Sequence, residues 1–249
     1  MATAPLLYVC VRPQQGAAAA EYESFRAAAR LDESQLVKLD LVHEPLPGDV
    51  FERYGGFFVG GSPFNVTDPE STKTDVQRRL EGDLERIAAA AMTADDSGTS
   101  AFFTCYGIGV VTRLLGGEVS RAYPEDTGPV TVDLTPAGEN DALLGTLARR
   151  FTALTAHKEG SALVPPGAVL LAKNIGCPVQ AYRVGDRLYA TQFHPEPTTR
   201  AFTERMAVYR DDGYFPANDF DTVAGRVLAA SVTEPVRLLR AFARAFGPA

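Results

Sequence analysis

A cysteine at the end of an apolar run is the residue of this chain best suited to chemistry. Cys105 follows the apolar stretch 101–104 and precedes the stretch 106–111, which contains two glycines. A short strand that stops at a cysteine and turns into a helix lifts the thiol out of a sheet. Further along the chain, His194 is followed two residues later by Glu196. A histidine held by a carboxylate takes a proton from a thiol. We therefore predict that Cys105 is a nucleophile, His194 its base and Glu196 the group that orients His194.

Each of these residues also has a structural interpretation. Cysteine is among the most buried residue types, so Cys105 taken alone fits a core position. Gly107, which permits a tight turn, and the presence of His194 together favour the nucleophile. Glu196 also fits the acidic first turn of a following helix, and the two roles are compatible. Cys10 lies inside a predicted strand and Cys177 in a Gly-Cys-Pro turn, so we interpret both as structural. Three widely spaced cysteines form neither a disulfide framework nor a zinc-ligand spacing, so we predict no metal and no other cofactor.

A glycine pair follows another predicted strand, 57–59, in the segment 60–63. Most such pairs are turns, but beside a nucleophile they aim backbone N–H groups at a developing oxyanion. The predicted donors are the N–H groups of Gly61 and Tyr106. Ligands in open α/β sheets bind outside the carboxyl ends of the strands, so the glycine pair, the cysteine and the histidine are expected to converge on one sheet edge. His157 also follows a predicted strand and fits a pocket position or a surface turn equally well.

The first half of the chain alternates between strand and helix patterns. Apolar runs predict the strands and helical spacing of apolar residues predicts the helices. Strands are expected over Leu6–Val11, Gln35–Val42, Phe57–Val59 and Ala101–Thr104, with helices over Ala17–Arg30, Ser71–Ala94 and Tyr106–Leu115. The alternation indicates an α/β fold, a three-layer sandwich with a mostly parallel central sheet and helices on both faces.

The second half consists mainly of adjacent strand patterns. These are Val130–Leu134, Phe151–Ala156, Val169–Lys173, Pro178–Val184 and Leu188–Phe193. Their succession favours an antiparallel sheet appended to the parallel one, with a tight turn at Gly185-Asp186. Three helices are expected at the end, over Thr198–Arg210, Thr222–Ala229 and Pro235–Phe246. We predict one domain over 1–210 and a C-terminal helical extension over 211–249 packed on it, in which Tyr214-Phe215-Pro216 forms a lid or an oligomer contact.

The composition excludes several partners. The chain has 249 residues, a formal net charge of −7 and 45% hydrophobic residues. Its Lys and Arg residues form no basic stripe, so a nucleic-acid partner is not expected. No apolar run approaches the ~20 residues that cross a bilayer, and no basic segment precedes a long apolar core at the N-terminus, so neither a membrane span nor a secretory signal is predicted. Three unpaired cysteines fit the reducing cytoplasm.

Three motifs together resemble the class I (triad) glutamine amidotransferases, and in particular the glutaminase domain of GMP synthases. The family has a Gly-Gly-Pro oxyanion loop, a Gly-x-Cys-x-Gly-x-Gln nucleophile elbow and a terminal Gln-Phe-His-Pro-Glu. This chain has 60–63 (Gly-Gly-Ser-Pro), 103–109 (Phe-Thr-Cys-Tyr-Gly-Ile-Gly) and 192–196 (Gln-Phe-His-Pro-Glu), in that order. The resemblance spans roughly residues 5–210 and implies a flavodoxin-like sheet.

The resemblance also implies a reaction. Cys105 would attack the side-chain amide carbon of glutamine, His194 would carry the proton to the leaving ammonia, and water would release glutamate from a γ-glutamyl thioester. The implied substrate contacts are Gly60, Ser62, Gly109 and His157. The implied partners are glutamine or a γ-glutamyl small molecule and a separate synthetase that accepts ammonia, with homo-oligomers also compatible.

Two positions depart from the family pattern. Phe103 replaces a glycine and is expected to crowd the elbow or reshape the pocket, and Gly109 replaces a glutamine that holds the substrate's backbone end. Two other functions therefore stay open: a γ-glutamyl hydrolase or peptidase with the same triad, and a non-catalytic binding or regulatory subunit. The retention of all three triad residues argues against the second, because the loss of any one would disable the chemistry.

Overall fold

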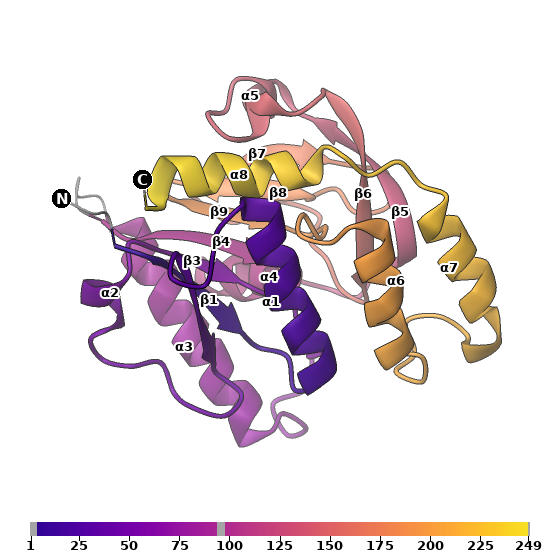
Figure 1. Ribbon diagram of the computed structural model, residues 1–249, viewed down its shortest axis with the longest axis horizontal. Coiled ribbons are helices and arrows are strands. Elements are labelled where there is room, and N and C mark those ends of the chain that lie inside the picture. Colours follow the sequence, from indigo (N-terminus) through magenta and orange to yellow (C-terminus); the bar gives the residue numbers. More distant parts are fainter. Residues whose placement is uncertain (1–3, 94–97, 249) are drawn as a thin grey trace.

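A nine-stranded mixed sheet organises the part of the chain that the computed structural model describes, residues 4–93 and 98–248 (Figure 1). The strand order is β2-β1-β3-β4-β9-β8-β7-β5-β6. The parallel half contains β2 (Leu36–Asp40), β1 (Leu6–Cys10), β3 (Gly56–Val59), β4 (Ser100–Thr104) and β9 (Leu188–Thr191). The antiparallel half contains β8 (Ala181–Val184), β7 (Ala168–Lys173), β5 (Glu125–Leu134) and β6 (Arg150–His157).

The predicted α/β fold is confirmed, and β9 is the strand at which its two halves meet. It pairs parallel with β4 on one side and antiparallel with β8 on the other. The tight turn between β8 and β9 begins at Gly185, whose φ of 56° lies in the left-handed region that favours glycine. The appended antiparallel strands therefore continue the parallel sheet edge to edge.

Helices cover both faces of the parallel half. Along β1, alternate side chains point to opposite faces, so Leu6 and Tyr8 pack under α1 (Gln15–Ala29) and α8 (Pro235–Phe246), and Leu7 and Val9 pack under α3 (Asp75–Met92) and α4 (Tyr106–Leu114). Thr74 caps α3 by accepting the N–H of Gln77 at 3.1 Å. Both faces are thus buried, which is why the central strands are apolar throughout.

The C-terminal helices α6 (Thr199–Val208) and α7 (Phe220–Leu228) lie beside the antiparallel half of the sheet (Figure 1). α7 packs on β5 and α6, and α6 also contacts α1. A small separate core joins them, formed by Leu154, Phe202, Met206, Val223 and Val227. In this way α6 is held between the end of β6 and the start of α1.

Element boundaries differ from the predicted ones in a few places. β5 begins at Glu125, five residues before the predicted strand. The sequence pattern missed this start because the pairing register shifts between Glu125 and Gly128, which interrupts the alternation of buried and exposed residues. The single-turn helices α2 (Val50–Arg53) and α5 (Pro136–Glu139) and the 3-10 turns 144–146 and 217–219 are too short to give a helical pattern. The predicted end of the long helix, Ala94, lies outside the described residues. No helix in the described ranges is long and apolar enough to cross a membrane.

Candidate active site

Three neighbouring strands, β3, β4 and β9, carry the predicted chemical residues past their carboxyl ends. Gly60 and Gly61 follow β3, Cys105 follows β4 and His194 lies shortly after β9. A Cβ atom placed on Gly61 would lie 2.8 Å from His194 Cε1 and 3.5 Å from Cys105 Cβ. The three elements therefore meet at one point, as the strand order predicts.

Cys105 occupies a strained turn between strand and helix. Its φ of 54° and ψ of −102° lie outside the regions that L-residues usually adopt, and it directly precedes the first residue of α4, Tyr106. Its N–H donates to the carbonyl of Thr191 in β9 at 2.8 Å, which ties the turn to the neighbouring strand. The N–H of Tyr106 belongs to the first turn of α4, where helix geometry leaves amides without an intrahelical acceptor.

The thiol of Cys105 is protonated at neutral pH. Burial raises its pKa to about 12, and although Arg12 favours the thiolate, Glu196 and Glu21 oppose it. A helix N-terminus favours a thiolate, whereas burial opposes it at this side chain, which is 7% exposed.

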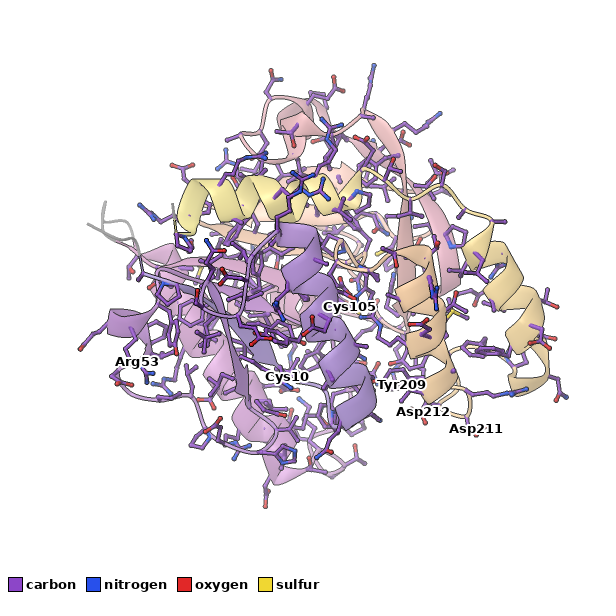
Figure 2. The ribbon with its side chains drawn as sticks, in the orientation of Figure 1. Cys10, Arg53, Cys105, Tyr209, Asp211 and Asp212 are labelled. Atoms are coloured by element: carbon purple, nitrogen blue, oxygen red, sulfur yellow. The ribbon has the colours of Figure 1, made fainter. Side chains whose placement is uncertain are left out.

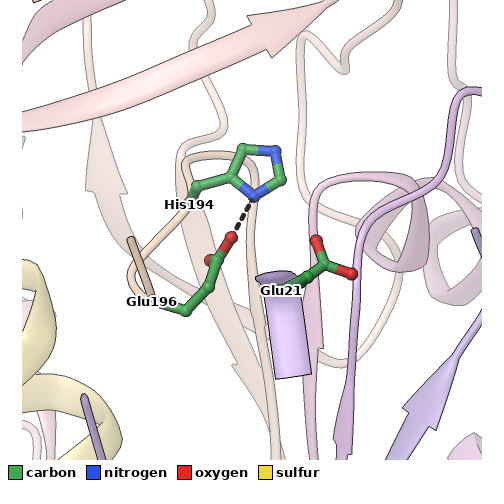
Figure 3. Close-up of side chains that lie close together, drawn as sticks. All are labelled: Glu21, His194 and Glu196. Carbon is green, nitrogen blue, oxygen red and sulfur yellow. Dashed lines mark hydrogen bonds and ion pairs between the residues drawn. The ribbon is translucent and has the colours of Figure 1, made fainter. Parts of the chain in front are cut away.

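His194 is held from two sides. Its backbone N–H donates to the carbonyl of Leu154 at 2.8 Å, and its Nδ1 lies 2.9 Å from Glu196 Oε1 (Figure 3). Burial lowers the pKa of the imidazole, against the pull of Glu196 in the other direction. An ionised carboxylate only accepts hydrogen bonds, so Nδ1 carries the hydrogen and Nε2 has a free lone pair. Such a neutral imidazole is able to accept a proton.

Arg205 of α6 fixes the carboxylate of Glu196. Its Nη1 donates to Glu196 Oε1 at 2.7 Å and to Glu21 Oε1 at 3.1 Å. Burial opposes the charge on Glu196, but His194 and Arg205 together lower the pKa of its carboxyl to about 2. Glu196 is therefore ionised under all physiological conditions, and it links α6 to the histidine.

Glu21 of α1 is a buried carboxylate that the sequence reading missed. It accepts from Tyr8 Oη at 2.8 Å, from Arg12 Nη2 at 2.7 Å and from the N–H of Gly61 at 3.3 Å. Although burial opposes its charge, Arg12 and Arg205 hold the pKa of its carboxyl below the ordinary value. A sequence signal was present: Glu21 occupies a position of the apolar face of α1, four residues after Ala17 and four before Phe25.

Of the described residues, Glu21, His194 and Glu196 bring ligand-type atoms within 4.8 Å of one another (Figure 3). Metal sites use such donor sets. Here the positive charge between the carboxylates is supplied by the guanidinium groups of Arg12 and Arg205, which bind them at 2.7–3.1 Å. The cluster is accounted for as a buried ion-pair network around the histidine.

The glycine pair leaves no room for side chains. A Cβ on Gly60 would collide with a carboxylate oxygen of Glu21, and one on Gly61 would lie 2.9 Å from Arg12 Nη2. Ser62 Oγ donates to the carbonyl of Val11 at 2.7 Å, which anchors the loop. The N–H of Gly61, predicted as an oxyanion donor, is directed to Glu21 in this structure.

The two departures from the family pattern have clear structural consequences. The ring of Phe103 is fully buried in the core under α4, and its Cδ1 would lie 2.9 Å from a Cβ on Gly107, so the ring fills the space that this glycine leaves. Phe103 thus packs closely against the elbow, as predicted, and lines neither cavity at Cys105. At Gly109, a Cβ would lie 3.1 Å from Val66 Cγ2 and 3.5 Å from Glu159 Oε1, so these side chains border the place of the missing glutamine.

The predicted pocket residue His157 is buried, with both ring nitrogens engaged. Nε2 lies 2.8 Å from Glu125 Oε2 and Nδ1 lies 2.8 Å from the carbonyl of Glu159. The carboxylate of Glu159 in turn accepts the N–H groups of Val66 and Thr67 at 2.8 and 3.0 Å. His157 thus lines the second cavity and contacts the Glu159 backbone there.

Two small cavities meet at Cys105. The first has a volume of about 40 Å³ and is lined mainly by α6 and the following loop: Arg12, Ser62, Cys105, Thr127, Ala156, His194, Phe202, Arg205, Met206, Tyr209, Tyr214 and Phe215. The second has about 20 Å³ and is lined by Ser62, Phe64, Asn65, Cys105, Tyr106, Ile108, Gly109, Val119, Ala156, His157, Lys158, Glu159, Ser161, Gln192 and Tyr214. Most of the predicted site residues line one of these two cavities. Gly61 lines neither cavity but lies against His194 and Cys105. Gly60 and Glu196 do not line the cavities.

Comparison with known proteins places this arrangement in a family. A family model described as glutamine amidotransferase class-I matches residues 29–208. The GMP synthase [glutamine-hydrolyzing] of Aeropyrum pernix is 37% identical over 109 residues, which are 43% of this chain and 20% of that protein. Gamma-glutamyl peptidase 3 of Arabidopsis thaliana is 25% identical over 154 residues, which are 58% of this chain and 55% of that protein. The matched segments therefore cover between a fifth and about half of the length of these relatives.

A solved structure of a glutamine amidotransferase from Thermotoga maritima shares the fold. It superposes with a TM-score of 0.72 over 97% of both chains, at 16% sequence identity. The fold likeness, the order of the three motifs and a family match that covers well over half of the chain agree with one another. The protein is a member of the class I glutamine amidotransferases.

Proposed function

We propose that the protein hydrolyses the side-chain amide of glutamine, or of a γ-glutamyl compound, through a γ-glutamyl thioester on Cys105. The observation that carries this proposal is the His194–Glu196 pair, whose imidazole lies against the same glycine, Gly61, as the Cβ atom of Cys105 in the strained elbow. A nucleophile, a base and an orienting carboxylate in this order are what acyl transfer to sulfur requires.

The protonation states define the first step. The pKa of Cys105 is raised and that of His194 is lowered, so both start neutral. The thiol proton passes to Nε2 of His194 as the sulfur bonds to the amide carbon, and Glu196 stabilises the imidazolium that forms. His194 then gives this proton to the leaving nitrogen as the C–N bond breaks. A water molecule cleaves the thioester by the same route, with His194 as its base, and glutamate leaves.

The oxyanion of the tetrahedral intermediate is assigned to the N–H of Tyr106, at the start of α4, and to that of Gly61. The second donor faces Glu21 in the free protein at 3.3 Å. A bond of this length is weak, and an oxyanion forms a shorter charge-assisted bond with an N–H. We infer that the Gly60–Gly61 peptide turns toward substrate when the intermediate forms.

The destination of ammonia depends on a partner. The matched part of the Aeropyrum pernix protein is 20% of its length, and its name is GMP synthase. A separate synthetase partner that takes ammonia from this chain follows by analogy. A second candidate function is the cleavage of γ-glutamyl compounds with water as the sole acceptor, and the longer match to the Arabidopsis γ-glutamyl peptidase favours it.

The test is to trap the thioester. The protein is incubated with glutamine and, separately, with a γ-glutamyl anilide, quenched in acid, digested with pepsin and analysed by peptide mass spectrometry. We expect a γ-glutamyl adduct on the peptide that contains Cys105 and release of glutamate, both lost in Cys105→Ala. Cys177→Ala, which removes a fully buried cysteine outside both cavities, is the matched control. If Cys105→Ala releases glutamate at the wild-type rate, the proposal fails. If folded wild-type protein releases none, a binding subunit is the better description.

A further inference from the structure

Two cavities with different lining residues meet at Cys105. Ser62, Ala156 and Tyr214 line both of them. Both linings mix polar and apolar groups. The second cavity contains the polar side chains of Asn65, Glu159, Ser161 and Gln192. The first contains two arginines and five large side chains with apolar surface: Phe202, Met206, Tyr209, Tyr214 and Phe215.

The catalytic geometry assigns a role to each cavity, provided that the proposed function holds. His194 lines the first cavity, whereas Tyr106 and Gly109 line the second. His194 must deliver its proton to the leaving nitrogen, so the leaving group lies on the side of the first cavity. The γ-glutamyl group lies on the other side, in the second cavity, where the oxyanion donor Tyr106 is found.

Ammonia, the leaving group of glutamine, needs no apolar subsite. The side chains of Phe202 and Met206 are 2% and 4% exposed, and they belong to the face of α6 that also carries Arg205. We propose that the first cavity is the subsite for a larger leaving group, an amino acid with an apolar and preferably aromatic side chain. The substrate is then a γ-glutamyl dipeptide, and its hydrolysis consumes one water to give glutamate and the free amino acid.

The first cavity also contains two buried arginines. Arg12 and Arg205 are each 6% exposed and line the first cavity. Within the described residues, Nε of Arg12 and Nη2 of Arg205 are buried without a hydrogen-bond partner. Buried donors of a charged group are costly when unpaired. The α-carboxylate of a leaving amino acid in this cavity would be attracted by the two guanidinium groups that line it, whereas a simple amine has no such group.

The loop that follows α6 must open to admit such a group. The first cavity, about 40 Å³, holds one or two water molecules and no phenyl group. Its outer side is formed by Tyr214 and Phe215, which are only partly buried. Three contacts of Tyr214 hold it in place. Its carbonyl accepts Thr127 Oγ1 at 3.3 Å, Lys158 Nζ lies 4.5 Å from its ring centroid, and the ring of Tyr209 lies 6.0 Å away. Figure 2 shows the start of this loop, at Asp211 and Asp212, next to Tyr209 at the end of α6. The loop then closes over the bound leaving group.

The test compares kcat/KM for γ-glutamyl-phenylalanine, γ-glutamyl-phenethylamine and glutamine on the full chain. We expect the dipeptide to exceed glutamine by about ten- to a hundred-fold, the effect of burying a phenyl side chain. We also expect it to exceed the phenethylamine compound at least about ten-fold, because only the dipeptide has a carboxylate for the arginines. α-Glutamyl-phenylalanine should not be cleaved.

Variants locate the effect. Met206→Trp fills the cavity and Phe215→Ala removes part of its outer side, and both should lower the ratio of dipeptide to glutamine kcat/KM at least about ten-fold. Val208 belongs to the same helix and is 46% exposed, so Val208→Trp should leave this ratio unchanged. If the two wall variants fold but leave this ratio unchanged, the leaving-group subsite is rejected.

The failures are distinguishable. Glutamine cleaved as well as the dipeptide overturns this inference and leaves the proposed function intact. Equal rates for the dipeptide and the phenethylamine compound overturn the role of Arg12 and Arg205. No cleavage of any γ-glutamyl amide overturns the proposed function, and with it the subsite.

Discussion

The carboxylate of Glu21 accepts the backbone N–H of Gly61 at 3.3 Å, although the two residues belong to different elements, α1 and the loop after β3. The same carboxylate pairs with Arg205, which pairs with Glu196, which holds His194. The loop expected to stabilise the oxyanion and the carboxylate that orients the base are thus joined by one buried ion-pair network. We therefore expect that a displacement of the Gly60–Gly61 loop also displaces the Glu196 carboxylate.

Gly61→Ala should disable the site without unfolding the protein. The added Cβ would lie 2.8 Å from His194 Cε1 and 2.9 Å from Arg12 Nη2, so the imidazole has to move. A displacement of this kind costs roughly 100-fold in kcat/KM. Gly82→Ala in α3, where nothing lies within 4 Å, is the control, and it should keep full activity with about 0.5–1 kcal/mol of added stability. Wild-type kinetics of Gly61→Ala would show that the close packing has no catalytic role.

Arg205 should act on the reaction through His194. Its charge lowers the pKa of His194, which burial lowers further, so the base stays neutral to lower pH. Arg205→Met removes that effect: the pKa of His194 rises, and the acid limb of the kcat/KM profile moves to higher pH. Arg205→Lys keeps the charge and should shift the limb much less. The pH–rate profiles of the three proteins decide this, and an acid limb at the same pH in all of them contradicts the role.

The alkylation of Cys105 by iodoacetamide should accelerate with pH well beyond neutrality. The thiolate is the reactive form, and burial raises the pKa of Cys105 to about 12. Below that pKa, the thiolate fraction grows about ten-fold per pH unit, so the rate should rise steadily from about pH 7 to 10. The measurement is the rate of mass increase, with Cys105→Ser to subtract reaction at Cys10 and Cys177, both fully buried. A plateau below about pH 8 would instead indicate a thiolate–imidazolium pair.

Restoring the family residue at position 103 should weaken the fold. The Phe103 ring is fully buried against Gly107 and lines neither cavity at Cys105. Phe103→Gly therefore removes a core ring and should lower the free energy of unfolding by about 3–5 kcal/mol or more. Denaturant titration measures this, with Leu163→Ala, whose side chain is 78% exposed, as a near-neutral control. A loss below about 1 kcal/mol would mean that the ring is not part of the core.

Much of the site was readable from short stretches of sequence. Two patterns involve only residues that are close together in the chain: a strand that ends at Cys105 before a helix, and a histidine two residues before Glu196. Such local patterns can be recognised without the tertiary structure. The alternation of strands and helices then predicts which chain segments end at the same edge of the sheet. The parallel half and the antiparallel continuation were predicted on the same grounds.

The properties that depend on distant neighbours were decided only in the folded chain. Glu21, Arg12 and Arg205 come from separate positions in the sequence and meet near His194. No local sequence pattern predicts such an ion-pair network. The pKa of Cys105 depends on burial in the folded chain, which raises it. The amino-acid order determines which groups are available for chemistry, because reactivity begins with side-chain type. The tertiary structure decides their charge states and partners, because solvation and hydrogen bonding act through space.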